Sequence, residues 1–293
     1  MTTTSTTEDE ALKASVFQRL HPRVYLERFL AENFRPDGRV PDAWRDVNLN
    51  VGVCVRGGLK PIEERSISTA DGSALVRLGN TTVVCGVKAE IAEPELDREG
   101  EGFLVPNLDL PAMCSPKFKP GPPTEEAQVL SDRLNEVLIA SGVLPLDSLC
   151  IHHGKSVWVL YVDATCINYD GNVFDATLLA MVAALKNTQL PKATYDEETG
   201  RTTCTRKIKS PLQINRTPIS MSFGVFNSTT LLADPTSFEE PLLDTTVSVV
   251  LDAASGDLIS AIQLGIDATP SQNLLHECMT AAAKRRPALA SRV

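Results

Sequence analysis

One segment of this 293-residue chain is apolar around its whole circumference when it is read as a helix. Residues 174–185 read FDATLLAMVAAL, and Asp175 is their only charged residue. A helix without a polar face has no side that it can turn towards water, so other elements must cover it on both faces. The segment therefore predicts a helix at the centre of a layered domain.

Runs with strand character precede and follow this segment. They are rich in β-branched residues or alternate with period two, and they are residues 73–78, 81–87, 156–167, 219–225 and 247–251. Gly79 and Asn80 separate the first two runs, and such a turn-forming pair predicts a hairpin. The last two runs carry almost no charge, and no lysines guard them. Bare strand edges of that kind favour pairing with other chains, so we expect the isolated chain to be marginally stable and a partner to stabilise it.

Further helices are expected on both sides of these strands. Thr124 follows the proline-rich loop 115–123 and is a candidate N-cap residue, with Glu125 and Glu126 placed favourably near the positive end of the helix. That helix has an apolar stripe at Leu130, Leu134, Val137 and Leu138. A last helix is expected to begin at Thr269-Pro270 and to run to about Arg286.

The order of strands and helices predicts one α+β or α/β domain with two similar β-rich halves around shared helices. The Thr-rich and acidic residues 1–10 are expected to form a disordered tail. Residues 11–33 predict two short helices interrupted at Pro22. Residues 47–190 form the first half and residues 191–293 the second, and no linker separates them.

Composition excludes several classes of function. The chain has 28 Lys and Arg against 37 Asp and Glu, a formal net charge of −9, which argues against a protein that grips nucleic-acid phosphates by itself. Its seven cysteines are scattered without zinc-ligand spacing, so we expect buried thiols in a reducing compartment. No signal peptide and no apolar run of about 18 residues is present, so neither secretion nor a membrane span is expected.

A succession of short motifs resembles the N-terminal signature of the RNase PH family. These motifs are Arg35-Pro36-Asp37-Gly38-Arg39, Asp71-Gly72-Ser73-Ala74 and Gly79-Asn80-Thr81-Thr82-Val83. Further stretches resemble the branch of non-catalytic ring subunits in the eukaryotic exosome, and they are Gly121-Pro122-Pro123, Trp158-Val159-Leu160-Tyr161, Asp170-Gly171-Asn172, Ala184-Leu185-Lys186-Asn187 and Arg216-Thr217-Pro218-Ile219. The resemblance extends from Glu27 to Lys284 and implies the RNase PH fold, which is ribosomal protein S5 domain 2-like. Residues 51–65 are longer than the strand pair usual in the family, and they predict an extended hairpin or a contact with a partner.

The resemblance also implies where catalysis takes place in active members. They bind phosphate at the N-terminus of the inner helix, through a small-residue turn followed by Ser or Thr and then Arg. In this chain Val173 and Phe174 occupy those two positions. Neither an aliphatic nor an aromatic side chain can coordinate phosphate, so the chain is expected not to be an enzyme.

Two other elements of the family site are degenerate. The paired aspartates near the metal fall on Asp234 and Glu240, which keep oxygen ligands but are expected to be remnants that hold no metal and no cofactor. An alternative interpretation is that Asp234 is a turn residue whose carboxylate accepts hydrogen bonds from its own local backbone. Where active members carry arginines, the loop before the long helix has Lys117 and Lys119, which are candidates for weak RNA contacts or are simply solvated.

These residues and the resemblance predict a non-catalytic subunit of an exosome core ring that assists 3′-to-5′ RNA processing and degradation. The partners implied are another RNase PH-like subunit in a heterodimer within a six-membered ring, RNA-binding cap subunits, an associated hydrolytic ribonuclease, and RNA held weakly or passing through the pore. The implied location is the nucleus, nucleolus and cytoplasm. An active phosphate-dependent 3′-to-5′ exoribonuclease is the alternative and requires Val173 and Phe174 to be misaligned. A free RNA-binding module is disfavoured by the net charge of −9.

Overall fold

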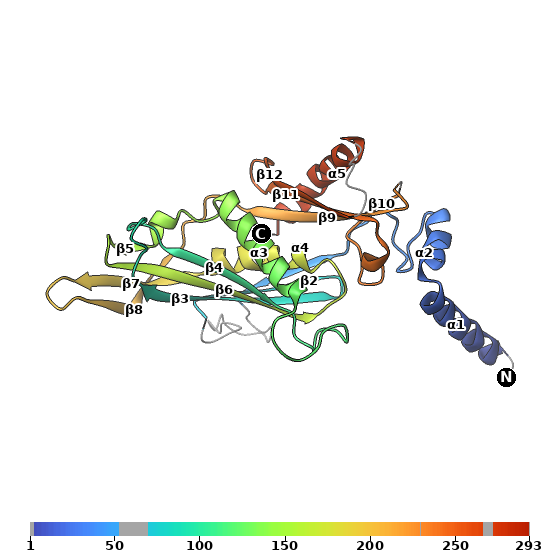
Figure 1. Ribbon diagram of the computed structural model, residues 1–293, viewed down its shortest axis with the longest axis horizontal. Coiled ribbons are helices and arrows are strands. Elements are labelled where there is room, and N and C mark those ends of the chain that lie inside the picture. Colours follow the sequence, from blue (N-terminus) through green and yellow to red (C-terminus); the bar gives the residue numbers. More distant parts are fainter. Residues whose placement is uncertain (1–2, 53–69, 229, 266–271, 293) are drawn as a thin grey trace, which may run out of the picture.

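The computed structural model describes residues 3–52, 70–228, 230–265 and 272–292 of the chain. Two main β-sheets lie on either side of a central helix (Figure 1). The six-stranded sheet has the order β1 (Val47–Val51), β2 (Gly72–Leu78), β3 (Thr81–Ala92), β6 (Ser156–Asn168) and β4 (Phe103–Asp109), with β5 (Cys150–His152) paired to β6. The four-stranded sheet has the order β10 (Thr230–Ala233), β9 (Pro218–Phe226), β11 (Thr245–Asp252) and β12 (Leu258–Gly265).

The remaining elements cover these sheets or project from them. A two-stranded sheet, β7 (Gln189–Asp196) and β8 (Arg201–Pro211), extends from one end of the molecule (Figure 1). The helices are α1 (Thr3–Leu20), α2 (Pro22–Ala31), α3 (Glu125–Ser141), α4 (Val173–Asn187) and α5 (Gln272–Ala290), with 3-10 turns η1 (Leu146–Leu149) and η2 (Glu240–Leu242). None of the described helices is both long and apolar enough to cross a membrane.

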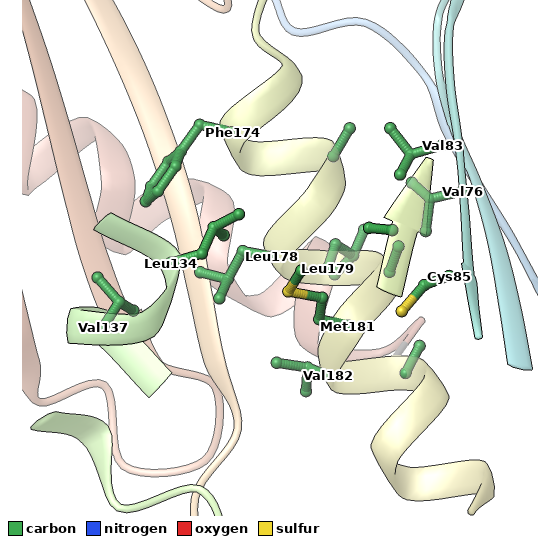
Figure 2. Packing of buried hydrophobic residues seen from close by; sticks show 14 of the residues in the cluster. Val76, Val83, Cys85, Leu134, Val137, Phe174, Leu178, Leu179, Met181 and Val182 are labelled. Atoms are coloured by element: carbon green, nitrogen blue, oxygen red, sulfur yellow. The ribbon is translucent and has the colours of Figure 1, made fainter. Parts of the chain in front are cut away.

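The central helix is α4, as its apolar circumference predicts. Every side chain from Val173 to Leu185 is buried, and the helix contacts β2 and β3 on one side and β9 on the other. Figure 2 shows Leu178 pointing towards α3, while Val83 of β3 lies on the opposite side of the helix. One continuous cluster of buried apolar residues includes both main sheets and α3, α4 and α5. The two β-rich halves around shared helices therefore form a single packed unit.

Local sequence signals place two further elements correctly. β2 and β3 pair antiparallel with Leu78 opposite Thr81, and Gly79 adopts the positive φ that the tight turn requires. At the start of α3, the Oγ1 of Thr124 accepts a hydrogen bond from the backbone N–H of Ala127 at 3.3 Å. The predicted hairpin and the predicted N-cap are both confirmed.

The N-terminal prediction is wrong in part. α1 begins at Thr3, so most of the segment predicted as a disordered tail is helical, and the first of the two helices is 18 residues long. The acidic residues 8–10 and the Ala-Leu-Lys-Ala run that follows favour a helix, and this preference outweighs the Thr-rich start. The break at Pro22 is confirmed, because that proline occupies the first turn of α2. α1 contacts α2 and points away from the sheets (Figure 1).

Other boundaries also differ from their predictions. The division at 190/191 falls within β7, because the hairpin continues straight out of α4 without any loop. The predicted start of the last helix at Thr269-Pro270 lies outside the described residues, and α5 continues beyond Arg286 to Ala290. Most of the segment 51–65 also lies outside them.

The two uncharged runs at 219–225 and 247–251 are not sheet edges. They are β9 and β11, which pair with each other in the interior of the four-stranded sheet. Their lack of charge reflects burial, because nearly every residue of both strands is buried. Of the six described cysteines, all are free thiols and four are buried, but Cys204 is exposed.

Candidate functional site

A cleft of about 960 Å³ opens at the N-terminal end of α4, between α3 and the four-stranded sheet. Four of the six residues that the sequence singles out line this cleft, and they are Lys117, Val173, Phe174 and Glu240. Asp234 and Lys119 are not among its lining residues. Most of the residues that the sequence singles out therefore lie around one cleft.

Backbone conformation fixes the turn that leads into α4. Gly171 has a φ of 76° and Asn172 a φ of 51°, both in the left-handed region that glycine and asparagine adopt most easily. A Cβ on Gly171 would lie 2.5 Å from the backbone nitrogen of Ser237. Glycine thus lets the turn approach the segment before η2, which carries Glu240.

A buried aromatic ring stands where active family members are expected to carry an arginine. Phe174 is 5% exposed, and the guanidinium carbon of Arg133 on α3 lies 4.5 Å from its ring centroid. Such a distance is typical of a cation–π contact. Figure 2 shows Phe174 at the start of α4, near Leu134 of α3. Phe174 therefore joins α4 to α3 and offers no donor to an anion.

Arg133 is a cation of the cleft that sequence reasoning missed. Its Nε and Nη2 atoms are buried and have no hydrogen-bond partner among the described residues. Burial lowers its pKa, against the opposing charges of Asp175 and Glu136. The only signal in the sequence is its position beside Leu134 in the apolar stripe, which places it near the buried face of α3.

The carboxyl group of Glu240 occupies the N-terminus of α4. Its Oε1 accepts a hydrogen bond from the backbone N–H of Asn172 at 2.7 Å, and its Oε2 accepts one from the Tyr169 hydroxyl at 2.6 Å. Burial raises the pKa of Glu240, against the opposing effect of these two donors. The first N–H groups of a helix and its positive dipole form a ready anion site. In this chain, a side chain of the protein itself fills that site.

Asp234 has no exposed surface and is engaged by an arginine. Its carboxylate accepts hydrogen bonds from the Nε and Nη2 of Arg45 at 2.8 and 2.7 Å. It also accepts one from the Arg45 backbone N–H at 3.0 Å and one from the Asn172 side-chain amide at 2.7 Å. Burial acts to raise the pKa of Asp234, but the bonds and charge of Arg45 outweigh it and the pKa lies below its ordinary value. The role of a turn carboxylate bonded to its own backbone is therefore wrong, because its partners are distant in sequence.

A second buried ion pair lies beside the first. Arg35 bonds both carboxylate oxygens of Glu239, and both residues are almost completely buried. The Nη1 of Arg35 also donates to the carbonyl of Ala233 at 2.6 Å, and its Nη2 donates to the carbonyl of Asp234 at 3.0 Å. Desolvated charges require such complete pairing. Arg35 belongs to the quoted family motif, but its partner Glu239 carried no signal in the sequence.

The two candidate RNA-binding lysines differ in their surroundings. The Nζ of Lys117 lies 2.6 Å from Oε2 of Glu126 and 5.4 Å from the ring centroids of both Phe118 and Tyr169. Lys119 is exposed on the same loop. Lys117 is thus neutralised at the rim of the cleft, while Lys119 faces solvent outside it.

A metal ion has no evident site in the described part of the chain. No cluster of three or more His, Cys, Asp or Glu side chains with suitable placement occurs among those residues. His152 and His153 turn to different carboxylates, with Nε2 of His152 3.3 Å from Glu197 and Nδ1 of His153 3.3 Å from Glu99. The Asp234 oxygens are bonded by Arg45 and Asn172, which leaves them poorly placed to act as ligands.

The fold of this chain has solved counterparts. One is a chain of the "archaeoglobus fulgidus exosome with RNA bound to the active site", which matches with a TM-score of 0.77 at 29% identity over 92% of this chain and 96% of that chain. Another is a chain of an "Archaeal exosome core", with a TM-score of 0.74 at 26% identity over 97% of this chain and 98% of that chain. The fold is therefore the RNase PH fold, as expected.

Sequence comparison shows which protein family the chain belongs to. Residues 61–191 match RNase PH, 3′ exoribonuclease family domain 1, and residues 216–285 match domain 2 of the same family. The chain is 40% identical over 265 residues to "Exosome complex component rrp43" of Schizosaccharomyces pombe, which covers 90% of this chain and 93% of that protein. It is also 39% identical over 252 residues to "Exosome complex component Rrp42" of Methanopyrus kandleri, covering 86% and 87%. The chain belongs to the RNase PH family.

Proposed function

We propose that the chain is a non-catalytic structural subunit of an exosome core ring, of the exosome component 8 type. The observation that carries this proposal is the state of the α4 N-terminus. The Glu240 carboxyl group fills the position where phosphate would bind, and Val173 and Phe174 supply no replacement donors. Membership in an exosome is supported by the names of the relatives in fission yeast and in archaea.

Phosphorolysis needs a bound phosphate nucleophile and a metal held near the scissile bond. A phosphate that approached α4 would have to displace Glu240, and an ionised carboxylate there would repel it. Asp234 could bind a cation only by giving up Arg45, which would leave a buried guanidinium without its partner. The need to displace Glu240 and the need to separate Asp234 from Arg45 both oppose catalysis by this chain.

The proposed partners follow from the ring. They are other RNase PH-like exosome subunits, one of which forms a heterodimer with this chain within a six-membered ring, together with RNA-binding cap subunits and an associated hydrolytic ribonuclease. RNA would touch the chain weakly, through Lys119 and the paired Lys117, as it passes through the pore. The net charge of −9 suits a structural subunit better than an independent RNA-binding protein. We place the complex in the nucleus, nucleolus and cytoplasm, in ribosomal RNA maturation and messenger RNA turnover.

A second candidate is an active phosphate-dependent 3′-to-5′ exoribonuclease. The observation in its favour is the similarity to an archaeal exosome whose solved structure has RNA bound at its active site. The contact between Phe174 and Arg133 weighs against it, because a phenyl ring stands at the position expected to supply an arginine, and the arginine beside this ring belongs to a different helix.

The experiment that separates the two candidates is a phosphorolysis assay on the chain co-purified with its RNase PH-like partner. A 3′-tailed RNA is incubated with Mg²⁺ and inorganic phosphate, and the nucleotide products are resolved. We expect no nucleoside diphosphate above background. A contaminating hydrolytic nuclease would release monophosphates, so the product itself serves as the control. Phosphate-dependent diphosphate release that is lost on Glu240→Ala would establish the second candidate.

A further inference from the structure

A small cavity lies where the start of α4 meets β9 and α5. It has a volume of about 20 Å³, and apolar side chains form most of its wall. Its polar lining residues are Asn172 and Asp175 at the start of α4, Ser220 of β9 and Arg285 of α5. A cavity needs about 10–15 Å³ to hold one water molecule, so this cavity has room for one water molecule and not for a larger ligand.

Three of these residues carry a buried polar atom that has no hydrogen-bond partner among the described residues. The atoms are Asn172 Oδ1, Ser220 Oγ and Arg285 Nε. Asn172 is 4% exposed and Ser220 is 6% exposed. A buried polar group without a partner has lost its hydrogen bonds to solvent without replacement, and native proteins rarely contain one. Three such atoms around one cavity therefore indicate a bound group that pairs with all of them.

Other buried hydroxyls without a partner do not lie at this cavity. In the described part of the chain, the hydroxyls of Ser73, Ser156 and Thr177 are buried and unpaired, but none of these residues lines the cavity. One small ligand can therefore explain the three atoms at the cavity, and it cannot explain the other hydroxyls. The same contrast supplies a matched control for an experiment.

The orientation of the Asn172 side chain is fixed by its neighbours. Its Nδ2 donates to Oδ2 of Asp175 at 2.9 Å and to Oδ1 of Asp234 at 2.7 Å. Because a carboxylate oxygen can only accept, the nitrogen of the amide must face these two groups. The amide oxygen of Asn172 is therefore the atom that needs a donor at the cavity.

The hydroxyl of Ser220 lies near Asp175. Burial raises the pKa of Asp175, and this hydroxyl is one of the groups that oppose the rise, although the two groups make no hydrogen bond of ordinary geometry. A hydroxyl whose proton is turned towards a carboxylate keeps its lone pairs to accept from another donor. Ser220 can therefore act as an acceptor at the cavity.

The three atoms match the hydrogen-bonding capacity of one water molecule. Arg285 Nε is a donor, whereas Asn172 Oδ1 and Ser220 Oγ can accept. A water oxygen accepts from the first atom, and its two hydrogens are donated to the other two. The guanidinium group of Arg285 disfavours a cation in the same place, and the amide oxygen of Asn172, which has no proton to donate, disfavours an anion.

We propose that the cavity is a binding site for one ordered water molecule, which accepts a hydrogen bond from Arg285 and donates hydrogen bonds to Asn172 and Ser220. The water links α4 of the first half to β9 and α5 of the second half. It also holds Asn172 in the orientation in which its amide bonds Asp175 and Asp234. The inference goes beyond the proposed function, because the site needs neither RNA nor a second subunit.

A crystal structure of the chain, alone or in its complex, tests the site directly at a resolution that shows ordered water. We expect one density peak at about 2.7–3.2 Å from each of the three atoms. Absence of this peak overturns the inference. A direct hydrogen bond between Arg285 Nε and Ser220 Oγ overturns it as well, because these atoms would then need no water between them.

A double-mutant cycle tests the water molecule in solution. Ser220→Ala removes one partner of the water, and Arg285→Lys keeps the positive charge but replaces the Nε donor by a methylene group. Both changes weaken the binding of the same water molecule, so their effects overlap. In urea unfolding, the increase in the unfolding equilibrium constant of the double variant should fall short of the product of the two single increases by about threefold or more.

The matched control replaces Ser220→Ala by Ser73→Ala. This change also removes a buried and unpaired hydroxyl, but one that does not line the cavity. Its effect should combine with that of Arg285→Lys additively, to within about twofold in the equilibrium constant. If the Ser220 cycle is as additive as the Ser73 cycle, the two cavity residues share no water molecule and the inference is wrong.

Discussion

The starts of α3 and α4 show two ways in which this chain begins a helix. α3 is capped locally, by the Thr124 hydroxyl and by Glu125 and Glu126 in its first turn. α4 begins after the N-cap residue Asn172, which has a left-handed backbone conformation and makes no side-chain cap. The carboxyl group that accepts a hydrogen bond from the Asn172 N–H comes from Glu240, 68 positions along the chain. The first arrangement stabilises one helix, while the second joins a helix to the opposite half of the domain.

The ion pairs beside the two helix starts differ in the same way. Lys117 and Glu126 form an exposed pair at the start of α3, with side chains 53% and 37% exposed. Arg45 and Asp234 form a buried pair below the start of α4, where the two side chains are 7% and 0% exposed. Solvent screens the first pair, whereas the second must compensate the desolvation of both charges. Loss of one partner should therefore have unequal consequences at the two sites.

The largest effect is expected for Asp234→Ala. This change leaves the buried guanidinium of Arg45 without its carboxylate, and we expect the free energy of unfolding to fall by about 3 to 5 kcal/mol. Urea unfolding followed by tryptophan fluorescence measures the loss. Asp234→Asn keeps an acceptor for the Asn172 amide and Arg45, so its loss should be smaller. A change below about 1 kcal/mol for Asp234→Ala would falsify the view that the loss of a buried partner costs more than the loss of an exposed one.

The second prediction concerns the pH dependence of Glu240. Burial raises its pKa in the folded protein, so the folded state holds this proton more tightly than the unfolded state does. Its ionisation therefore costs stability as the pH rises above the ordinary range for glutamate. Relative to Glu240→Gln, the wild-type protein should lose stability as the pH is raised from about 4 to 8, as measured by urea unfolding at each pH.

The difference in stability between the wild-type protein and Glu240→Gln reports the ionisation of Glu240 alone. Asp234 has a lowered pKa, so its contribution is present above the ordinary aspartate range and is lost as the pH falls through its folded pKa, the opposite direction to Glu240. Asp175 and Asp234 are present in both proteins, so their titrations cancel in the difference between wild type and Glu240→Gln. A difference that stays constant with pH, or one that favours the wild type as the pH rises, contradicts the assigned direction.

The comparison of the two helix starts also explains what could be predicted from the sequence. The cap of α3, the hairpin at Gly79 and the buried α4 depend on neighbouring residues or on one period of hydrophobicity, and all three are confirmed. Val173 and Phe174, which the resemblance places at the phosphate-binding positions of active members, line the cleft. The partners of Asp234 and Glu240 were not predicted, because Arg45 and Asn172 become their neighbours only after both halves have folded.

The edge of the second sheet shows the same limit. Period-two alternation predicts β9 and β11 as strands, but their low charge is compatible both with a buried interior strand and with an exposed edge. The order of the strands decides between these two, and it places β9 and β11 in the interior of the sheet, with β10 and β12 at its edges. Strand order depends on long-range pairing, which no local pattern in residues 219–265 encodes.

The smallest effects are expected at the loop before α3. Because Lys117 and its partner Glu126 are both exposed to solvent, Lys117→Ala should change the free energy of unfolding by less than about 1 kcal/mol. Lys117 and Lys119 should differ in how much they contribute to RNA binding. Each lost phosphate contact lowers the slope of log affinity against log salt concentration by about one unit.

Since Glu126 already neutralises Lys117, the change Lys119→Glu in the assembled complex should reduce that slope more than Lys117→Glu does. The slope is measured from RNA-binding titrations at several salt concentrations, and Lys155→Glu, an exposed lysine outside the cleft, is the control. If both loop variants match that control, the loop lysines are only solvated and RNA does not contact this loop. If Lys117→Glu has the larger effect, RNA must break the pair with Glu126, and the start of α3 is then as closely tied to function as the start of α4.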